Sequence, residues 1–410
     1  MTPRSPARDL PIEIDARDLP PLGMPAEVFL RDYWQKRPLL IRNAFPGFET
    51  PVMPEDLAGL ACEERALSRI VLHDRANDAW TLRTGPFAEE EFPGMPHQDW
   101  TLLVQDVDKW DPDVRALLDH FDFLPRWRLD DIMISFAAPG GSVGAHVDQY
   151  DVFLLQAHGH RRWQIDASPN PPTDFRDDVA LKLLRTFNPT HDWVLGPGDM
   201  LYLPPGVPHH GVAEDACLTF SVGMRAPSAA ELLGDFVDTL LAEADEDLRY
   251  RDDDLAPPED ANEIDAAAMT RAVTALNVLR MNDPDRLGDW FGRFMTLYRA
   301  VGESLDPDPP RSRIEIEFDL AQGAVLERHP WTRTAWRKRS AKGRASLYVA
   351  GQVHELPQAD ARRLAGATIV DEPVYASLGE DARTLLLDLL AQGHYHLAVE
   401  DTGEDEDDED

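Results

Sequence analysis

The chain has 410 residues, 43% of them hydrophobic and 28% charged, which is an ordinary composition for a globular protein of two or three domains. No apolar run approaches the roughly 20 residues of a membrane span, and residues 1–18 contain no apolar signal segment, so we expect a cytoplasmic protein. Two cysteines exclude a disulfide framework and a thiolate zinc cluster, and a net charge of -35 favours a basic partner over nucleic acid.

The N-terminal part begins with a helix predicted from Pro25, because proline suits a first helical turn and Pro38 would end the segment. Hydrophobic patterning over the next eighty residues predicts short elements with turns between them. These are strands over 39–41 and 79–83, helices over 53–67 and 111–120, and an apolar run over 100–107.

From Trp127 to Arg225, short apolar runs alternate with glycine and proline turns. Many short antiparallel strands with such punctuation indicate a sandwich or barrel. The strands are expected over 132–136, 152–156, 161–165, 193–195, 200–203 and 217–222. We predict an α+β protein whose centre is a double-stranded β-helix of the jelly-roll or cupin type.

After Ala226 the pattern turns helical, with Ser228 as a candidate N-cap. Helices are expected over 231–241, 263–281 and 286–305, followed by a proline-rich linker over 306–310. The remainder mixes strands at 314–318 and 346–349 with helices at 358–365 and 380–392, an order that resembles a winged-helix domain. Residues 400–410 are nearly all acidic, which predicts a disordered tail.

Three residues in the central part form a candidate metal site. His146 and Asp148 stand at i and i+2, so a strand would place both side chains on one face. His209 follows a stiff corner, PPGVP, at 204–208. Two histidines and one carboxylate form the facial triad of non-haem Fe(II) oxygenases. His210 is a rival for the third position, and strand parity does not choose between these neighbours because the corner is irregular.

Such an oxygenase needs a dicarboxylate co-substrate that the protein must hold. Arg161 and Arg162 open a strand and therefore point to opposite faces, so one of them can reach inward and form a bidentate salt bridge. Ser135 is a hydroxyl donor in an apolar strand. A further group of candidates for holding a cationic substrate beside the metal consists of Asp131, Tyr150 and Asp151.

One basic cluster stands out near the C-terminus, with two tryptophans interleaved: Trp331, Arg333, Trp336, Arg337, Lys338, Arg339, Lys342 and Arg344. Such a cluster is typical of nucleic-acid contacts, but it also suits an acidic surface of the same chain. Because the overall charge is strongly negative, we expect no direct nucleic-acid binding.

The motifs over 134–153, 159–163, 197–209 and 220–227 resemble those of bacterial JmjC-type ribosomal oxygenases, nearest to the enzymes that hydroxylate an arginine of a large-subunit ribosomal protein. The resemblance also covers the layout. It implies a JmjC catalytic domain with N-terminal helices at 1–226, a helical dimerisation region at 227–305 that makes a homodimer, a winged-helix domain at 306–399 and the acidic tail at 400–410.

The resemblance implies an oxygenase that uses Fe(II) and 2-oxoglutarate to hydroxylate the β-carbon of arginine, with release of succinate. It implies three iron ligands, two residues that hold 2-oxoglutarate and two that lie on the side of the substrate arginine. These are, in that order, His146, Asp148 and His209; Arg161 and Ser135; Asp131 and Tyr150.

Other functions stay open on the residues alone. A JmjC oxygenase can act on a different target, as a histidyl hydroxylase or a demethylase, and acidic pocket residues do not separate hydroxylation from demethylation. A non-catalytic JmjC scaffold would be marked by loss of a metal ligand, and all three are present here. His210 departs from the family, in which an acidic residue is common at that position.

Overall fold

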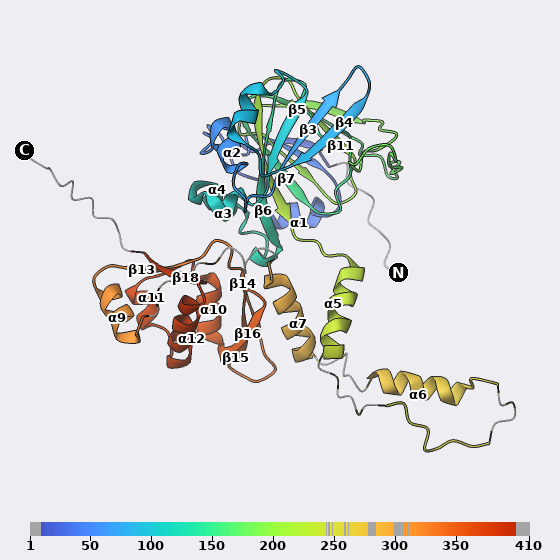
Figure 1. Ribbon diagram of the computed structural model, residues 1–410, viewed down its shortest axis with the longest axis vertical. Coiled ribbons are helices and arrows are strands. Elements are labelled where there is room, and N and C mark those ends of the chain that lie inside the picture. Colours follow the sequence, from blue (N-terminus) through green and yellow to red (C-terminus); the bar gives the residue numbers. More distant parts are fainter. Residues whose placement is uncertain are drawn as a thin grey trace, which may run out of the picture. The chain divides into compact units, whose positions relative to one another are not determined.

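A computed structural model describes residues 10–242, 249–257, 262–277, 284–298 and 311–398, together with a few single residues between them. The chain divides into two compact units at the junction of Ala226 and Pro227 (Figure 1). No helix within the described ranges is long and apolar enough to cross a membrane. The predicted tail over 400–410 and part of the predicted linker over 306–310 lie outside the described residues.

The first unit, blue to green in Figure 1, is built on two β-sheets. The larger sheet has the strand order β1-β2-β10-β7-β12-β6-β5-β3-β4, and the smaller has the order β11-β8-β9. The strands are β1 Glu13–Asp15, β2 Leu39–Arg42, β3 Ser68–Asp74, β4 Ala79–Thr84, β5 Trp100–Val104, β6 Leu129–Ala137, β7 Val152–His158, β8 Arg161–Ile165, β9 His191–Leu195, β10 Met200–Leu203, β11 His209–Ala213 and β12 Cys217–Met224. Apart from the parallel pair β1 and β2, neighbouring strands run antiparallel.

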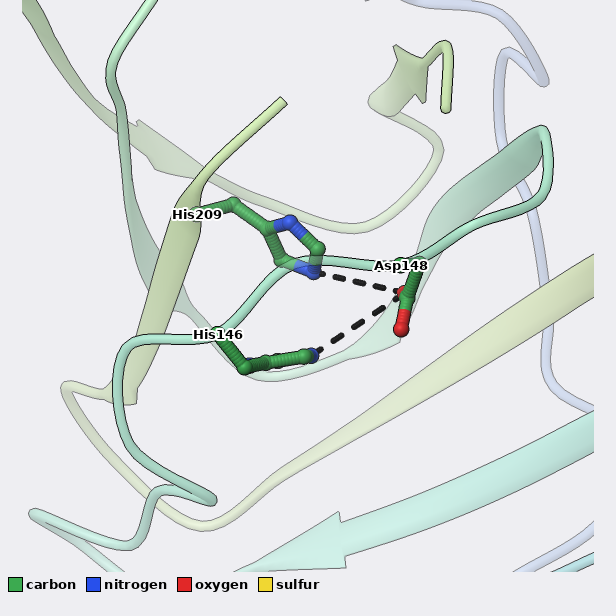
Figure 2. Close-up of side chains that lie close together, drawn as sticks. All are labelled: His146, Asp148 and His209. Atoms are coloured by element: carbon green, nitrogen blue, oxygen red, sulfur yellow. Dashed lines mark ion pairs between the residues drawn. The ribbon is translucent and has the colours of Figure 1, made fainter. Parts of the chain in front are cut away.

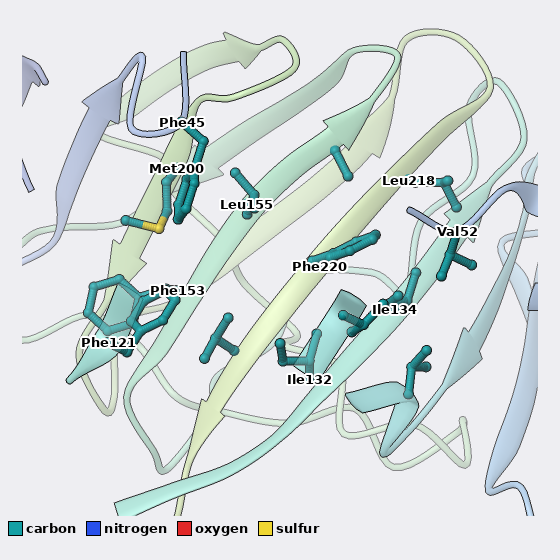
Figure 3. Close-up of a cluster of buried hydrophobic side chains, with 14 of the residues drawn as sticks. Phe45, Val52, Phe121, Ile132, Ile134, Phe153, Leu155, Met200, Leu218 and Phe220 are labelled. Carbon is teal, nitrogen blue, oxygen red and sulfur yellow. The ribbon is translucent and has the colours of Figure 1, made fainter. Parts of the chain in front are cut away.

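Alternation along the strands decides which layer each side chain enters. Ile132, Ile134, Phe153 and Phe220 point to one side of the larger sheet and join the main hydrophobic core (Figure 3). This core also includes Phe29 and other residues of the N-terminal segments. Side chains of the opposite parity form a second apolar cluster with the smaller sheet: Leu40, Val152, Leu154, Trp163, Ile165, Leu195, Leu201 and Leu203. The two sheets therefore pack face to face, which confirms the predicted double-stranded β-helix.

Short helices connect the early strands. They are α1 Ala26–Asp32, α2 Pro54–Leu60, α3 Val107–Trp110 and α4 Pro112–Ala116, with 3-10 turns at Glu89–Gly94, Leu117–Phe121 and Arg126–Arg128. The helix predicted over 53–67 ends at Leu60, because the chain turns at 61–67 before β3 begins at Ser68. Neither β3 nor β11 was predicted, since β11 (HHGVA) has little apolar content and β3 lacks a simple alternation.

In the second unit, α5 Ala229–Ala242, α6 Ala266–Asn277 and α7 Pro284–Thr296 precede a mixed domain. That domain contains α9 Arg313–Ala321, β13 Val325–Arg328, β14 Thr334–Lys338, β15 Arg344–Val349, β16 Gln352–Pro357, α10 Gln358–Gly366, β17 Ile369–Val370, α11 Glu372–Ala376, α12 Glu380–Ala391 and β18 Tyr395–Ala398. Its two small sheets have the orders β17-β13-β18 and β14-β15-β16. Helix α7 lies directly on the second of these, since a Cβ atom at Gly292 would come within 2.3 Å of the Tyr348 ring.

The strand predicted over 314–318 is wrong, because these residues belong to helix α9. The alternation of Ile and Glu suggested a strand, but Ile316 and Leu320 are the buried residues and stand four apart, as on one face of a helix. Ser312 accepts a hydrogen bond from the Glu315 backbone N–H, and the Glu315 carboxylate accepts one from the Ser312 N–H. This capping box, S-x-x-E, is a helix start signal that the sequence already contained.

Candidate metal centre

His146, Asp148 and His209 converge on one point between the two sheets (Figure 2). One ligand atom from each lies within 4.8 Å of the other two. The Asp148 Oδ2 atom is 3.6 Å from His209 Nε2 and 4.0 Å from His146 Nε2. Among the described residues this is the group of at least three potential ligands that is close enough to hold a metal ion.

Backbone and ring hydrogen bonds orient both imidazoles. The backbone N–H groups of His146 and His209 each donate to the carbonyl of the other, at 3.0 Å. His146 Nδ1 lies 2.9 Å from the Gly144 carbonyl, and His209 Nδ1 lies 3.0 Å from the Val207 carbonyl. A ring nitrogen that faces a carbonyl must donate, so Nδ1 carries the hydrogen and the Nε2 lone pair is directed at the shared point.

The charge state of His209 also suits a ligand. It is buried, and burial, together with the nearby His146, lowers the pKa of His209 to about 4 in spite of the opposing charge of Asp148. The ring is therefore neutral near pH 7, and a neutral imidazole is the form that binds a metal.

The expectation that His146 and Asp148 lie on one regular strand is wrong. His146 forms only an isolated bridge with His209, and Asp148 lies in an irregular loop whose carbonyl accepts from the Gly206 N–H at 2.8 Å. The two side chains still share one side because the loop is tied to the β10–β11 corner at both residues. Gly144, at φ +81°, allows the turn that delivers His146.

His209, and not His210, points to the centre. These residues open β11, so their side chains point to opposite sides. The His210 ring contacts the edge of Phe187, with ring centroids 6.1 Å apart. His160 is exposed and pairs with Asp215 at 2.9 Å, away from this centre.

Arg161 is the inward member of the arginine pair. Only 2% of Arg161 is exposed, whereas Arg162 lies at the surface between Asp192 (2.8 Å) and Glu214 (2.6 Å). Arg161 has two long contacts, to Ser135 Oγ (3.5 Å) and the Gly211 carbonyl (3.4 Å). No carboxylate of the described chain pairs with it, and its Nε has no partner there. Burial lowers the pKa of the guanidinium, so the site favours an anion.

Asp131 and Tyr150, the residues predicted for the substrate side, interact with each other and, through Tyr150, with Asp148. Burial raises the pKa of Asp131 to about 7, and the charges of Asp106, Asp130 and Asp108 add to this effect. Tyr150 keeps 40% of its surface exposed, and burial followed by the charges of Asp148 and Asp131 raises the pKa of its hydroxyl. A carboxylate and a phenol are groups suited to binding a cationic side chain, so their role toward the substrate stays a prediction.

Asp151 has a different role from the one predicted. It is fully buried and accepts hydrogen bonds from Tyr202 Oη (2.7 Å), Gln35 Nε2 (2.8 Å) and Arg128 Nη2 (3.3 Å). These donors occupy the carboxylate, so it has no room for a substrate. Asp151 instead anchors the end of the loop that carries Asp148 and Tyr150.

Three arginines of the basic cluster form ion pairs within the second unit. Arg337 contacts Asp285 at 3.0 Å, Arg339 contacts Asp289 at 2.8 Å, and Arg344 contacts Glu355 at 2.9 Å. These pairs support the alternative prediction, in which acidic groups of the same chain neutralise the cluster. The absence of direct nucleic-acid binding stays a prediction.

Comparison with known proteins agrees with the fold. The JmjC domain family matches residues 116–232, and the ROXA-like winged-helix family matches residues 279–396. The chain is 38% identical over 300 residues to the ribosomal protein uL16 3-hydroxylase of Escherichia coli, which covers 73% of this chain and 79% of that protein. It is 41% identical over 230 residues to a probable ribosomal oxygenase of Haemophilus influenzae, which covers 56% of each chain.

Among solved structures, the ribosomal oxygenase YcfD of Escherichia coli in complex with cobalt and 2-oxoglutarate superposes with a TM-score of 0.79. Its sequence is 32% identical, and the alignment covers 92% of this chain and 99% of YcfD. A fold with a JmjC barrel, a two-histidine-one-carboxylate centre and a ROXA-like winged helix defines one class of non-haem oxygenases. The chain belongs to the JmjC-type ribosomal oxygenase family.

Proposed function

We propose that the chain is an Fe(II)- and 2-oxoglutarate-dependent oxygenase that hydroxylates the β-carbon of an arginine in a large-subunit ribosomal protein. The observation that carries the proposal is the convergence of His146, Asp148 and His209 in the same barrel as Arg161, which is buried and has no carboxylate partner in the described chain. The name of the Escherichia coli relative supports ribosomal protein uL16 as the substrate. A ribosomal substrate supports a cytoplasmic location.

The donor set fits Fe(II). Two imidazole nitrogens and one carboxylate are the facial triad that leaves the remaining positions of the metal open. The relative YcfD has been solved in complex with cobalt. When bound, iron with 2-oxoglutarate supplies the oxidation of a C–H bond by dioxygen, with loss of carbon dioxide and formation of succinate. The protein supplies position: both Nε2 atoms are fixed through Nδ1, and Asp148 is fixed through its backbone.

The residues around Arg161 fit the co-substrate. Arg161 is a fork of donors in a buried position, and the Ser135 hydroxyl lies 3.5 Å from its Nη1. A carboxylate there would accept from both side chains and neutralise the buried charge. Gly211 keeps this place open, because a Cβ atom would come within 2.7 Å of Arg161 Nε and of the Trp163 ring.

A coupled assay tests the proposed activity. The full chain with Fe(II), ascorbate and 2-oxoglutarate is expected to form succinate, and the addition of ribosomal protein uL16 should raise the rate. A chain that forms no succinate under these conditions, with iron bound, would contradict the oxygenase. Stimulation by a histidine- or methyl-lysine-containing protein instead of uL16 would support the histidyl hydroxylase or demethylase alternative.

We propose that Asp131 and Tyr150 hold the substrate arginine. The pH dependence of the KM for the substrate tests the role of Asp131. The guanidinium binds the ionised carboxylate, and the pKa of Asp131 is about 7. The KM for a uL16 peptide should therefore fall about tenfold from pH 6 to pH 8, as the ionised fraction rises. In Asp131→Asn the KM should be high and nearly independent of pH. A variant that keeps the slope of the wild type would exclude Asp131 as its origin.

We propose that the helical region makes a homodimer. Met269, Val273 and Leu276 follow one face of α6, and 53–63% of each is exposed. An apolar stripe of this kind is suited to a second copy of the chain. Sedimentation at micromolar concentration should give twice the chain mass of 46.1 kDa. Val273→Asp should give the single mass, whereas Thr274→Asp, outside the stripe, should leave the dimer intact; a monomeric wild type would contradict the proposal.

A further inference from the structure

Three buried donors on strands β5 and β8 have no hydrogen-bond partner among the described residues. They are the Thr101 hydroxyl, Arg161 Nε and the Trp163 indole N–H. Arg161 and Trp163 already belong together, since the guanidinium carbon lies 5.0 Å from the indole ring centre. Thr101 is on a different strand, β5, and no motif of the sequence singles it out.

Strand pairing places Thr101 on the side of the larger sheet that faces Arg161. Thr101 lies opposite Ala137, and the next pair of the same parity is Leu103 with Ser135. Side chains of directly opposed residues share a face, so Thr101, Ala137 and Ser135 point the same way. Ser135 Oγ is the atom that Arg161 Nη1 approaches at 3.5 Å.

A second path of contacts leads to the same place. Ala137 packs against Ala213 and Cys217 in one small buried cluster. Ala213 lies directly opposite Arg161 in the smaller sheet. Ala137 therefore connects the two sheets: it lies opposite Thr101 in the larger sheet and packs against Ala213, which lies opposite Arg161 in the smaller one.

A structural role does not explain the Thr101 hydroxyl. Thr101 is fully buried, and its neighbours in β5 (Trp100, Leu102, Leu103 and Val104) are apolar. A buried hydroxyl without a partner costs stability, and valine would fill the same volume in a strand without that cost. Thr219 is the useful contrast: it is buried on the same face, and its hydroxyl donates to Gln156 Oε1 at 3.1 Å.

We propose that Thr101 is a further co-substrate-binding residue, whose hydroxyl donates to the carboxylate of 2-oxoglutarate that Arg161 holds. The inference rests on the proposed function. A carboxylate has about four lone-pair directions, which is more than Arg161 and Ser135 fill by themselves. An acceptor that is brought into this space satisfies Thr101 and Arg161 Nε together, so one ligand accounts for two buried donors.

The substitution Thr101→Val separates a ligand-binding hydroxyl from a structural one. Without ligand, the melting temperature of Thr101→Val should be no lower than that of the wild type, because no internal hydrogen bond is lost. Thr219→Val, the same change at a paired hydroxyl, should lower it. With Mn(II) in place of iron, the Kd for 2-oxoglutarate should rise about tenfold in Thr101→Val, as expected for a lost hydrogen bond to a charged group. Thr101→Ser, which keeps the hydroxyl, should bind like the wild type.

The measurement is thermal shift and calorimetric titration of the full chain with Mn(II) and 2-oxoglutarate, and it needs no turnover. Wild-type affinity for Thr101→Val would overturn the inference, and so would a lowered melting temperature in the absence of ligand. A wild type that does not bind 2-oxoglutarate would instead contradict the proposed function. If Thr101→Val does not fold, Thr101→Ser and Thr101→Ala decide: only the alanine variant should lose affinity.

Discussion

Asp148→Ala is expected to abolish 2-oxoglutarate turnover and leave the protein folded. Its carboxylate supplies the one anionic ligand of the centre, within 4.0 Å of both histidine Nε2 atoms. Without it, two neutral imidazoles are left to bind a divalent cation. Loss of an orienting group outside the ligand shell already costs about 10- to 100-fold in metal affinity or activity, so loss of a ligand should reduce turnover by more than about a hundredfold.

The fold should survive because the loop is held by its backbone. The Asp148 carbonyl accepts from Gly206, and Asp151 anchors the loop end through three side chains. Succinate formation and iron content measure the effect, while the melting temperature reports the fold. Asp177→Ala, which removes an exposed carboxylate that pairs with Arg185, is the matched control and should keep full turnover. Retained turnover in Asp148→Ala would remove Asp148 from the triad.

Arg161→Ala is expected to raise the 2-oxoglutarate concentration needed for half-maximal turnover by roughly a hundredfold, since hydrogen bonds to charged groups contribute about 1.5–3 kcal/mol each. Arg161 is buried with no carboxylate partner in the described chain, so its charge stabilises an anionic ligand and not the fold. High 2-oxoglutarate should therefore restore part of the rate. Turnover is measured across a titration of 2-oxoglutarate at saturating iron.

Arg162→Ala is the control for this titration. Arg162 is the next residue on the same strand, but it lies at the surface and pairs with Asp192 and Glu214. Its removal should leave the response to 2-oxoglutarate unchanged. An unchanged response in Arg161→Ala, with an altered one in Arg162→Ala, would move the role to Arg162 and contradict the structure.

The chemistry of the centre was predictable because it depends on short-range patterns. The spacing of His146 and Asp148 and the stiff corner before His209 indicate a triad even though the local conformation was misjudged. Strand parity predicted that one of Arg161 and Arg162 points inward, and the surrounding sheet selects Arg161. Such predictions of site residues stay correct when the local backbone conformation is wrong, because they depend only on the direction in which the side chain points.

Properties that depend on contacts between distant segments were not predictable. Asp151 was expected to face a substrate, but Tyr202, Gln35 and Arg128 reach it from three other parts of the chain. A role for Thr101 can be inferred only from the pairing of β5 with β6, which places this residue on the face of the sheet toward Arg161. A sequence without its strand register does not contain this information.

The error at α9 has a different cause. Ile314, Ile316 and Phe318 alternate with acids, but the Ser312 capping box and the burial of Ile316 and Leu320 fix a helix. Ile314 and Phe318 are left exposed, so the alternation did not mark a buried face. In so short a segment, a capping signal was better evidence than periodicity.

Intact-mass analysis of ribosomal protein uL16 tests the central claim most directly. The protein is measured before and after incubation with the full chain, Fe(II) and 2-oxoglutarate, and again with the Asp148→Ala variant. The account predicts one added oxygen, mapped by fragmentation to the β-carbon of one arginine, with the wild type and not with the variant. Succinate release without added oxygen would discard this substrate, and an oxygen added equally by Asp148→Ala would contradict the proposed centre.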